Sequence, residues 1–195
     1  MWMRTTSPQR RGGTIAVWDD VLSPAELDAI TAVGDKLARD KARVADSRDA
    51  ERTTAHRVTE VAWMMQNDET LPFYQRMSEI VLALNECFYK YDLHGLENFQ
   101  YAIYHGNEGG HYDWHIDNGE HTDQPRKLSL SLQLSDGDAY DGCDLEIYAR
   151  SRLDVAPRKR GTLIAFPSFA LHRVTPITRG IRKSLVCWVS GPEFR

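Results

Sequence analysis

Residues 127–134 read Lys-Leu-Ser-Leu-Ser-Leu-Gln-Leu, and this alternation bears most directly on the fold. Successive side chains of an extended strand point to opposite faces. The leucines at 128, 130, 132 and 134 therefore share one face, and Ser129, Ser131 and Gln133 share the other. If helices cover the leucine face, the polar face lines the inside of a barrel and predicts a cavity for a polar ligand. A strand whose polar face meets solvent gives the same alternation, so the pattern alone leaves both arrangements open.

Short alternating segments continue on both sides of this strand. Beyond Leu96 we expect strands at residues 98–105, 111–117, 127–134, 144–149, 161–166, 171–177 and 181–189, separated by Gly, Asp, Asn and Pro. A series of short strands at this spacing is typical of a β-sandwich or a β-barrel.

The N-terminal half predicts helices that can cover such a core. Ser23 is suited to cap a helix, with Pro24 at the first helical position and Glu26 completing a capping box. We also expect a second amphipathic helix over 71–91, an edge strand over 14–18 and a strand over 58–65. The expected fold class is α+β, with a jelly-roll core and N-terminal helices packed on one sheet. We expect a single domain, in which residues 1–97 form a support layer and residues 98–195 form the core.

Residues 39–57 are densely charged and contain almost no large apolar side chain. A solvated helix end and loop would explain this composition. The alternative is a mobile lid over a binding site, because long loops in compact domains are often functional. The mixed charges of the segment would suit a polar or peptide substrate.

Composition narrows the classes of partner and compartment. The 195-residue chain has 24 Lys+Arg against 28 Asp+Glu, a net charge of −4, whereas nucleic acids and anionic membranes favour basic surfaces. No run of residues approaches the roughly 18 apolar residues of a membrane span, and the N-terminus lacks the apolar segment of a signal peptide. Cys87, Cys143 and Cys187 are far apart, which argues against a disulfide framework. We therefore expect a cytoplasmic protein without a nucleic-acid or membrane partner, and the sequence predicts no oligomeric state.

The pattern His-x-Asp occurs at His111/Asp113, His115/Asp117 and His121/Asp123. Residues i and i+2 of a strand point the same way, so both side chains of such a pair can reach one metal ion. A histidine from a distant strand would complete a set of two histidines and one carboxylate. That set leaves coordination positions open and is typical of non-haem Fe(II) oxygenases, whereas a structural zinc site closes all four. The spacing alone does not choose among the three pairs.

His172 is the histidine available for the distant position, because no other histidine follows residue 121. Arg182 opens the strand that comes after it and shares a face with Ser184. An arginine in a strand can bind a carboxylate through two parallel hydrogen bonds. Alone, each of these residues would suggest a surface ion pair or a buried structural histidine. Their combination with a His-x-Asp pair indicates a binding site.

From about residue 85 to residue 195, the chain resembles the iron- and 2-oxoglutarate-dependent dioxygenases of the prolyl 4-hydroxylase-like group. The resemblance rests on residues 104–117 (YHGNEGGHYDWHID), 142–145 (GCDL) and 166–188 (FPSFALHRVTPITRGIRKSLVCW). Cys143 stands where the family has the second glycine of a Gly-Gly-x-Leu stretch. The N-terminal 84 residues match the family more loosely.

The resemblance implies a double-stranded β-helix, a jelly roll of cupin-like type, and it selects one His-x-Asp pair. Tyr112 stands three residues before His115, as the family motif requires, so His115, Asp117 and His172 are the implied Fe(II) ligands. Arg182 would hold the distal carboxylate of 2-oxoglutarate. Three further side chains are expected beside the same co-substrate, namely Tyr104, Ser184 and Gln133. His105 and His111 are expected in outer or surface positions, Gln100 lines the pocket or packs in its strand, and Trp114 and Trp188 are expected in the core.

The activity implied by the resemblance is hydroxylation of an aliphatic C–H with O2, Fe(II) and 2-oxoglutarate, and the substrate we favour is a prolyl residue in a polypeptide. The carboxylate ligand Asp117 favours hydroxylation over chlorination. Ascorbate is expected as a reductant on the same resemblance. One alternative substrate is a free amino acid or small metabolite. An alternative of another class is a metal-binding jelly-roll module without turnover.

Overall fold

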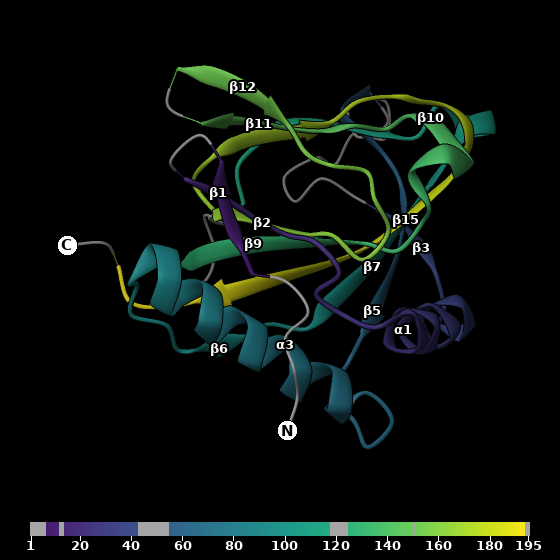
Figure 1. The fold of residues 1–195 in the computed structure, drawn as a ribbon. Helices are drawn as coiled ribbons and strands as arrows, with labels where there is room; N and C mark the ends of the chain where they lie inside the picture. Colours follow the sequence, from purple (N-terminus) through teal and green to yellow (C-terminus); the bar gives the residue numbers. More distant parts are fainter. Residues whose placement is uncertain (1–6, 12–13, 43–54, 118–124, 150, 194–195) are drawn as a thin grey trace.

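The computed structural model describes residues 7–11, 14–42, 55–117, 125–149 and 151–193. Within these residues two antiparallel sheets form the body of the molecule, and the helices lie along the outside of the larger one (Figure 1). The expected α+β fold class, a double-stranded β-helix with helices on one sheet, is confirmed.

The larger sheet has ten strands, β1 (Gln9–Arg11), β2 (Ile15–Trp18), β3 (Asp40–Lys41), β5 (Glu60–Met64), β6 (Gly95–Leu96), β7 (Phe99–His105), β9 (Arg126–Gln133), β10 (Tyr140–Gly142), β13 (Leu163–Pro167) and β15 (Ile177–Ser190). Its main path runs β1-β2-β13-β9-β15-β7-β5-β3, and β10 and β6 also pair with β15. The smaller sheet has the order β12-β11-β14-β8-β4, with β4 (Arg57–Val58), β8 (His111–His115), β11 (Leu145–Ala149), β12 (Arg152–Val155) and β14 (Leu171–Val174).

The helices are α1 (Pro24–Lys36) and α3 (Leu71–Leu84), and α3 continues into a π-helical turn, η1 (Asn85–Tyr89). Short 3-10 turns follow β7 and precede β10, at η2 (Gly106–Glu108) and η3 (Gly137–Ala139). The predicted capping box of α1 is present, since the backbone N–H of Glu26 donates to the Ser23 hydroxyl and the Glu26 carboxylate accepts from the Ser23 backbone.

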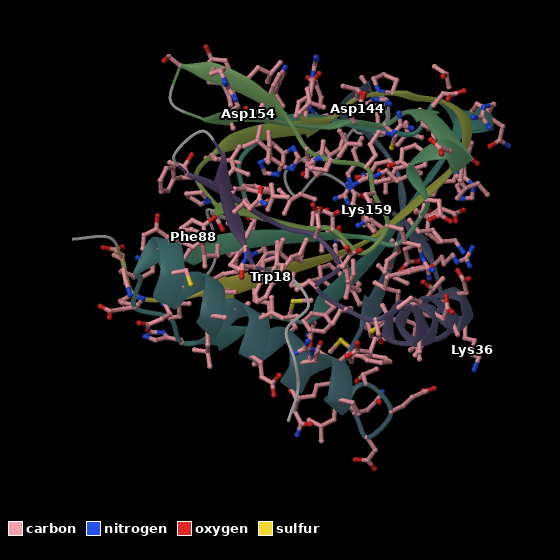
Figure 2. The ribbon with its side chains drawn as sticks, viewed as in Figure 1. Trp18, Lys36, Phe88, Asp144, Asp154 and Lys159 are labelled. Atoms are coloured by element: carbon pink, nitrogen blue, oxygen red, sulfur yellow. The ribbon has the colours of Figure 1, made fainter. Side chains whose placement is uncertain are left out.

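Strand β9 occupies the centre of the larger sheet, between β13 and β15, and both of its faces are buried. Its three alternating leucines, together with Leu134 just after the strand, belong to one apolar cluster with the buried faces of α1 and α3. Trp18 lies in this layer between sheet and helices, whereas Lys36 projects from the end of α1 (Figure 2). The polar side chains of β9 face the smaller sheet. Of the two arrangements that the alternation at 127–134 left open, the structure therefore adopts the one in which helices cover the leucine face.

Two predictions about strands are wrong. Residues 14–18 do not form an edge, because β1 pairs with the outer side of β2. The strand expected over 58–65 is two strands in different sheets: Arg57–Val58 pairs with β8, and Glu60–Met64 pairs with β7. The partners β8 and β7 lie far away in the sequence, so the local pattern does not contain this change of sheet.

The division at residue 97 into a support layer and a core stays a prediction. Strands from residues before 97 take part in both sheets, since β2 and β5 extend the larger sheet and β4 extends the smaller one. In the ranges that the structure describes, no helix is long and apolar enough to cross a membrane. The lid expected over 39–57 lies mostly outside the described residues.

We expect Leu132→Ala to lower the free energy of unfolding by about 2–5 kcal/mol, because a fully buried leucine in a packed layer leaves a cavity when truncated. Leu153→Ala is the matched control, since Leu153 is 41% exposed on β12 and its loss should cost less than about 0.5 kcal/mol. Urea unfolding of both variants measures the difference. Equal losses would contradict the packing described for β9.

Candidate functional site

A cavity of about 330 Å³ lies between the two sheets. The smaller sheet contributes His115 from β8 and His172 from β14 to its wall, and the larger sheet contributes Ser131 from β9 and Arg182 from β15. Because β9 turns its polar face toward this space, the cavity expected from the KLSLSLQL alternation is present. Gln133, on the same face of β9, is buried beside Arg182.

Three possible metal ligands converge at one end of the cavity. His115 and His172 are directly opposite each other in the register of β8 and β14, and their ring centroids are 4.1 Å apart. Asp117 follows β8 by two residues, and its carboxylate oxygens lie 3.7 Å from His115 Nε2 and 3.4 Å from His172 Nε2. One ligand atom from each residue falls within 4.8 Å of the others. The residues predicted from the His-x-Asp pattern and the late histidine are thus brought together.

Backbone carbonyls hold both imidazoles in the orientation that a metal requires. His115 Nδ1 lies 2.7 Å from the Asp113 carbonyl oxygen, and His172 Nδ1 lies 2.9 Å from the Ala170 carbonyl oxygen. A carbonyl can only accept, so each Nδ1 carries a proton, and each Nε2 is the ring nitrogen that faces Asp117. This arrangement of an imidazole between a backbone acceptor and an open inner nitrogen is typical of metal-ligating histidines.

Asp117 is fixed by two serines that the sequence analysis did not single out. Ser129 on β9 donates its hydroxyl hydrogen to Asp117 Oδ2 over 2.6 Å, and Ser168 lies 3.0 Å from Ser129. The Asp117 backbone N–H also donates to the Ser168 carbonyl over 2.8 Å. These bonds orient the carboxylate, and they connect the polar face of β9 to the metal-ligand cluster.

The electrostatics favour a neutral His115 and an ionised Asp117, whereas for His172 burial would lower the pKa but the Asp117 carboxylate raises it. Burial and the neighbouring His172 lower the pKa of His115 to about 3. Burial alone would raise the pKa of Asp117, but His172, His115 and the Ser129 hydrogen bond hold it well below its usual value. A neutral imidazole and a carboxylate are the protonation states that coordinate a metal.

Arg182 occupies another part of the cavity wall and is almost fully buried, with 1% exposure. Its Nε and Nη2 both donate to Gln133 Oε1, over 3.2 and 3.0 Å, and Gln133 Nε2 in turn donates to the Pro157 carbonyl. No acidic side chain among the described residues forms an ion pair with it. A buried cation without an anion is costly, and a bound carboxylate would remove that cost.

Tyr104 and Ser184 lie where the sequence analysis expected them, beside Arg182. Tyr104 is opposite Arg182 in the β7–β15 register, and the guanidinium carbon is 5.5 Å from the centroid of its ring. Ser184 is 1% exposed and lines the same cavity. Burial raises the pKa of Tyr104, so its phenol stays protonated and able to donate a hydrogen bond.

The other histidine pairs lie away from this cluster or outside the described residues. His111 contacts the carbonyl oxygens of Gly109 and Ala55, and His105 lies 3.2 Å from the Glu60 carboxylate. The pair His121/Asp123 falls outside the described residues. Trp188 is buried as expected but also lines the cavity, whereas Trp114 is only partly buried.

Four cavity groups were missed or left open by the sequence analysis. Gln100 lines the cavity and accepts a hydrogen bond from Arg57, and Arg126 stacks on Trp188 at 4.0 Å while forming a bidentate pair with Glu97. Trp63 lines the cavity from β5. Their signal lies in strand pairing between distant segments, which no local motif reveals.

A family model described as the 2OG-Fe(II) oxygenase superfamily matches residues 99–190, the stretch that holds all of these candidate ligands. Over this stretch, a little under half of its length, the chain is similar to that superfamily. Members of an enzyme family of this description use Fe(II) and 2-oxoglutarate, and the chain's two-histidine, one-carboxylate cluster is consistent with it.

Two curated proteins illustrate the similarity, one over part of this chain and one over most of it. A PKHD-type hydroxylase of Synechococcus sp. (strain CC9311) is 42% identical over 84 residues, which are 43% of this chain and 38% of that protein. A PKHD-type hydroxylase of Xanthomonas campestris pv. campestris (strain B100) is 27% identical over 182 residues, covering 88% of this chain and 76% of that protein. The match to the first relatives thus spans about two fifths of their length.

Solved structures share the fold. A prolyl-4-hydroxylase of Pseudomonas putida matches with a TM-score of 0.70 and 22% identity, covering 93% of this chain and 94% of that one. A prolyl hydroxylase of Trichoplax adhaerens, solved with a peptide fragment of the hypoxia inducible factor oxygen degradation domain, matches with a TM-score of 0.73 and 17% identity over 92% of this chain and 84% of that one. At these identities the likeness establishes the fold alone.

We expect His172→Ala to weaken Fe(II) binding by at least about 100-fold, because loss of a ligand should exceed the 10- to 100-fold effect of losing an outer hydrogen-bond partner. His111→Ala is the matched control, since its ring contacts two backbone carbonyls away from the cluster. Anaerobic equilibrium dialysis with Fe(II) measures both. Loss of binding in His111→Ala with retention in His172→Ala would show that the metal site has been placed wrongly.

Proposed function

We propose that the chain is an Fe(II)- and 2-oxoglutarate-dependent dioxygenase that hydroxylates an aliphatic C–H of its substrate. The observation that supports this most strongly is a single cavity with two complementary ends. One end gathers His115, Asp117 and His172, and another part of its wall holds the buried Arg182, which pairs with no acidic side chain of the described residues. These two features match a metal and a dicarboxylate that binds it.

The donor set fits iron. Two imidazole Nε2 atoms that face one ionised carboxylate form the 2-His-1-carboxylate set that leaves positions open and suits non-haem Fe(II). A structural zinc site would close its coordination with four protein ligands, and the described residues gather three. We therefore assign His115, Asp117 and His172 as the iron ligands.

The far wall fits 2-oxoglutarate. Arg182 is fixed by Gln133, so its guanidinium is oriented before any ligand binds, and a carboxylate can replace the missing counter-charge. Ser184 and the protonated phenol of Tyr104 are placed to donate further hydrogen bonds to the same carboxylate. We assign Arg182, Tyr104, Ser184 and Gln133 to the binding of 2-oxoglutarate, with Gln133 acting through Arg182.

When bound, iron and 2-oxoglutarate with O2 supply the oxidation that converts a C–H to a C–OH, while 2-oxoglutarate is converted to succinate and CO2. The protein's own residues hold the geometry. Tyr112 stacks on His115 with centroids 3.5 Å apart, and Ser129 holds the Asp117 carboxylate. Phe166, Leu145 and Trp188 line the cavity with apolar surface that limits the access of water to the reacting atoms.

A metal-binding module without turnover explains these features less well. Such a module gains nothing from a buried cation that is fixed by Gln133 and lacks an acidic partner among the described residues. An open coordination sphere beside a cavity is likewise needed only if a small molecule binds there.

We propose a prolyl residue of a polypeptide as the substrate, supported by the names of the hydroxylases to which the chain is similar. Ascorbate as a reductant is proposed on the family resemblance alone. A cytoplasmic location is supported by Cys87, Cys143 and Cys187, which are free in the described structure. The net charge of −4 supports the absence of a nucleic-acid partner.

The proposed activity predicts that the purified protein forms succinate from 2-oxoglutarate only when Fe(II) and O2 are both present. A slow rate is expected without substrate, and a prolyl peptide should increase it and gain 16 Da, the mass of one oxygen atom, in proportion. Mass spectrometry of succinate and peptide checks both products. Succinate formation that is unaffected by a metal chelator, or none under any condition, would contradict the proposal.

We expect Arg182→Ala to raise the dissociation constant for 2-oxoglutarate by two to three orders of magnitude while Fe(II) stays bound, because breaking a buried charge pair costs about 3–5 kcal/mol. Arg182→Lys should be milder, since it keeps the charge but loses the planar fork. Arg179→Ala is the control, because Arg179 pairs with Asp141 at the surface. Calorimetric titration distinguishes them, and a large effect of Arg179→Ala with none for Arg182→Ala would overturn the assignment.

A further inference from the structure

We infer that Arg57 is a second carboxylate-binding group of the cavity and that it recognises a carboxylate carried by the substrate that is hydroxylated. This inference deepens the proposed function and rests on it, since it assumes that a substrate enters the cavity beside the metal ligands. It narrows the substrate to a molecule with a negative charge close to the carbon that reacts.

Arg57 is a buried cation whose charge is not balanced by the described residues. Its side chain is 9% exposed and lines the cavity, and its Nη2 donates to Gln100 Oε1 over 2.9 Å. Within the described ranges no carboxylate pairs with it, and its buried Nε has no hydrogen-bond partner. A guanidinium has five N–H donors, and a buried charge with unused donors is expensive unless a ligand supplies an anion.

The position of Arg57 places such an anion next to the metal ligands. Arg57 is opposite Tyr112 in the β4–β8 register, so the two side chains share a face, and its guanidinium carbon lies 4.2 Å from the centroid of the Tyr112 ring. His115 stacks on the same ring with its centroid 3.5 Å away, and His56 meets the ring edge-on at 5.6 Å. One aromatic ring therefore separates the guanidinium from a proposed iron ligand.

The other arginines of the cavity are already accounted for. Arg126 is neutralised by the two carboxylate oxygens of Glu97, and it stacks on Trp188. Arg182 is assigned to one carboxylate of 2-oxoglutarate, and the other carboxylate of that molecule belongs at the iron. No carboxylate of the co-substrate and no acidic side chain of the described residues is left for Arg57, so we assign the anion it binds to the substrate.

The surroundings of Arg57 leave room for that substrate. Arg57, Trp63 and Gln100 line the cavity of the metal cluster and also a second cavity of about 460 Å³, so Arg57 stands where the two adjoin. Trp63 is 45% exposed and offers an apolar ring beside the charge. A ligand with an apolar part and a carboxylate fits this combination of a guanidinium and an indole.

Two kinds of substrate could supply the carboxylate, and Arg57 would bind the same group in both. One is the α-carboxylate of a free amino acid or of the last residue of a peptide. The other is an acidic side chain next to the target residue within a peptide. In both cases the carboxylate lies a few bonds from the carbon that reacts.

The test compares acids with their uncharged amides. N-acetyl amino acids, including N-acetylproline, are paired with the corresponding N-acetyl amino amides, and N-acetyl-Asp-Pro-amide is paired with N-acetyl-Asn-Pro-amide. Quenching of tryptophan fluorescence measures binding, since Trp63 and Trp188 line the cavity. Stimulated succinate formation and a gain of 16 Da measure turnover.

For wild-type protein we expect at least one acid to bind and react at least about tenfold better than its amide, because a hydrogen-bonded charge contributes about 1.5–3 kcal/mol. Arg57→Ala should reduce this preference to less than about twofold, Arg57→Lys should keep part of it, and Arg179→Ala should leave it unchanged. A preference confined to the N-acetyl acids assigns the α-carboxylate. A preference confined to the Asp peptide assigns the side chain.

Equal use of acids and amides by the wild type, failure of every acid to bind, or a preference that survives Arg57→Ala would each overturn the inference. Loss of folding in Arg57→Ala, checked by circular dichroism, is separated from loss of recognition by Arg57→Lys, which keeps the charge. Failure of the proposed function is distinguished by the basal reaction, because a wild type that forms no succinate with Fe(II) and O2 is not a dioxygenase. In that case the fluorescence titrations with the acids and their amides still test whether Arg57 binds a carboxylate.

Discussion

The burial of strand β9 on both faces is the constraint on which the rest of the structure depends. A strand in this position has to divide its side chains by chemistry, because one face meets helices and the other meets a second sheet. Its leucines pack against α1 and α3, while Ser129, Ser131 and Gln133 turn toward the smaller sheet. Buried polar groups need partners, and Ser129 finds one in Asp117 while Gln133 finds them in Pro157 and Arg182. The site is therefore a consequence of how the core is built.

The register between paired strands brings the residues of the site together. Opposite positions on paired strands bring side chains together, as with His115 and His172, Arg182 and Tyr104, and Arg57 and Tyr112. What remains unpaired is informative. Both Arg182 and Arg57 are buried without an acidic partner in the described part of the chain, and both line the cavity that holds the metal-ligand cluster. Buried charge without a counter-charge points to anions that arrive with ligands.

Sequence reasoning succeeded where the signal is local or carried by an ordered motif. The alternation at 127–134 predicted the two faces of β9, and Ser23 with Glu26 predicted the start of α1. It failed where the outcome depends on long-range pairing, as for the change of sheet at Thr59. It also missed the short strand β1, which pairs with β2, the next strand along the chain. The helix expected over 71–91 ends in a π-helical turn that apolar spacing does not distinguish from α-helix.

The residues of the candidate site also fall into those that a motif identifies and those that only strand pairing brings to the site. His115, Asp117, His172 and Arg182 stand in a spaced motif, and that motif is enough to select them from the sequence. Ser129 was placed on the correct face, but its bond to Asp117 depends on where β8 ends relative to β9. Arg57 lies in a charged stretch whose composition suggests a solvated loop, and only its pairing with β8 buries it.

The central claim is that the metal cluster and Arg182 hold two ends of one co-substrate, and calorimetry tests it most directly. Binding of 2-oxoglutarate is compared with binding of glutarate, which has both carboxylates but lacks the keto oxygen, in metal-free protein and in protein loaded with Fe(II) under anaerobic conditions. The account predicts that Fe(II) tightens the binding of 2-oxoglutarate by at least about tenfold, a coupling of roughly 1.4 kcal/mol, and tightens that of glutarate much less. Equal affinity for 2-oxoglutarate with and without metal would show that the two ends of the cavity do not bind one molecule.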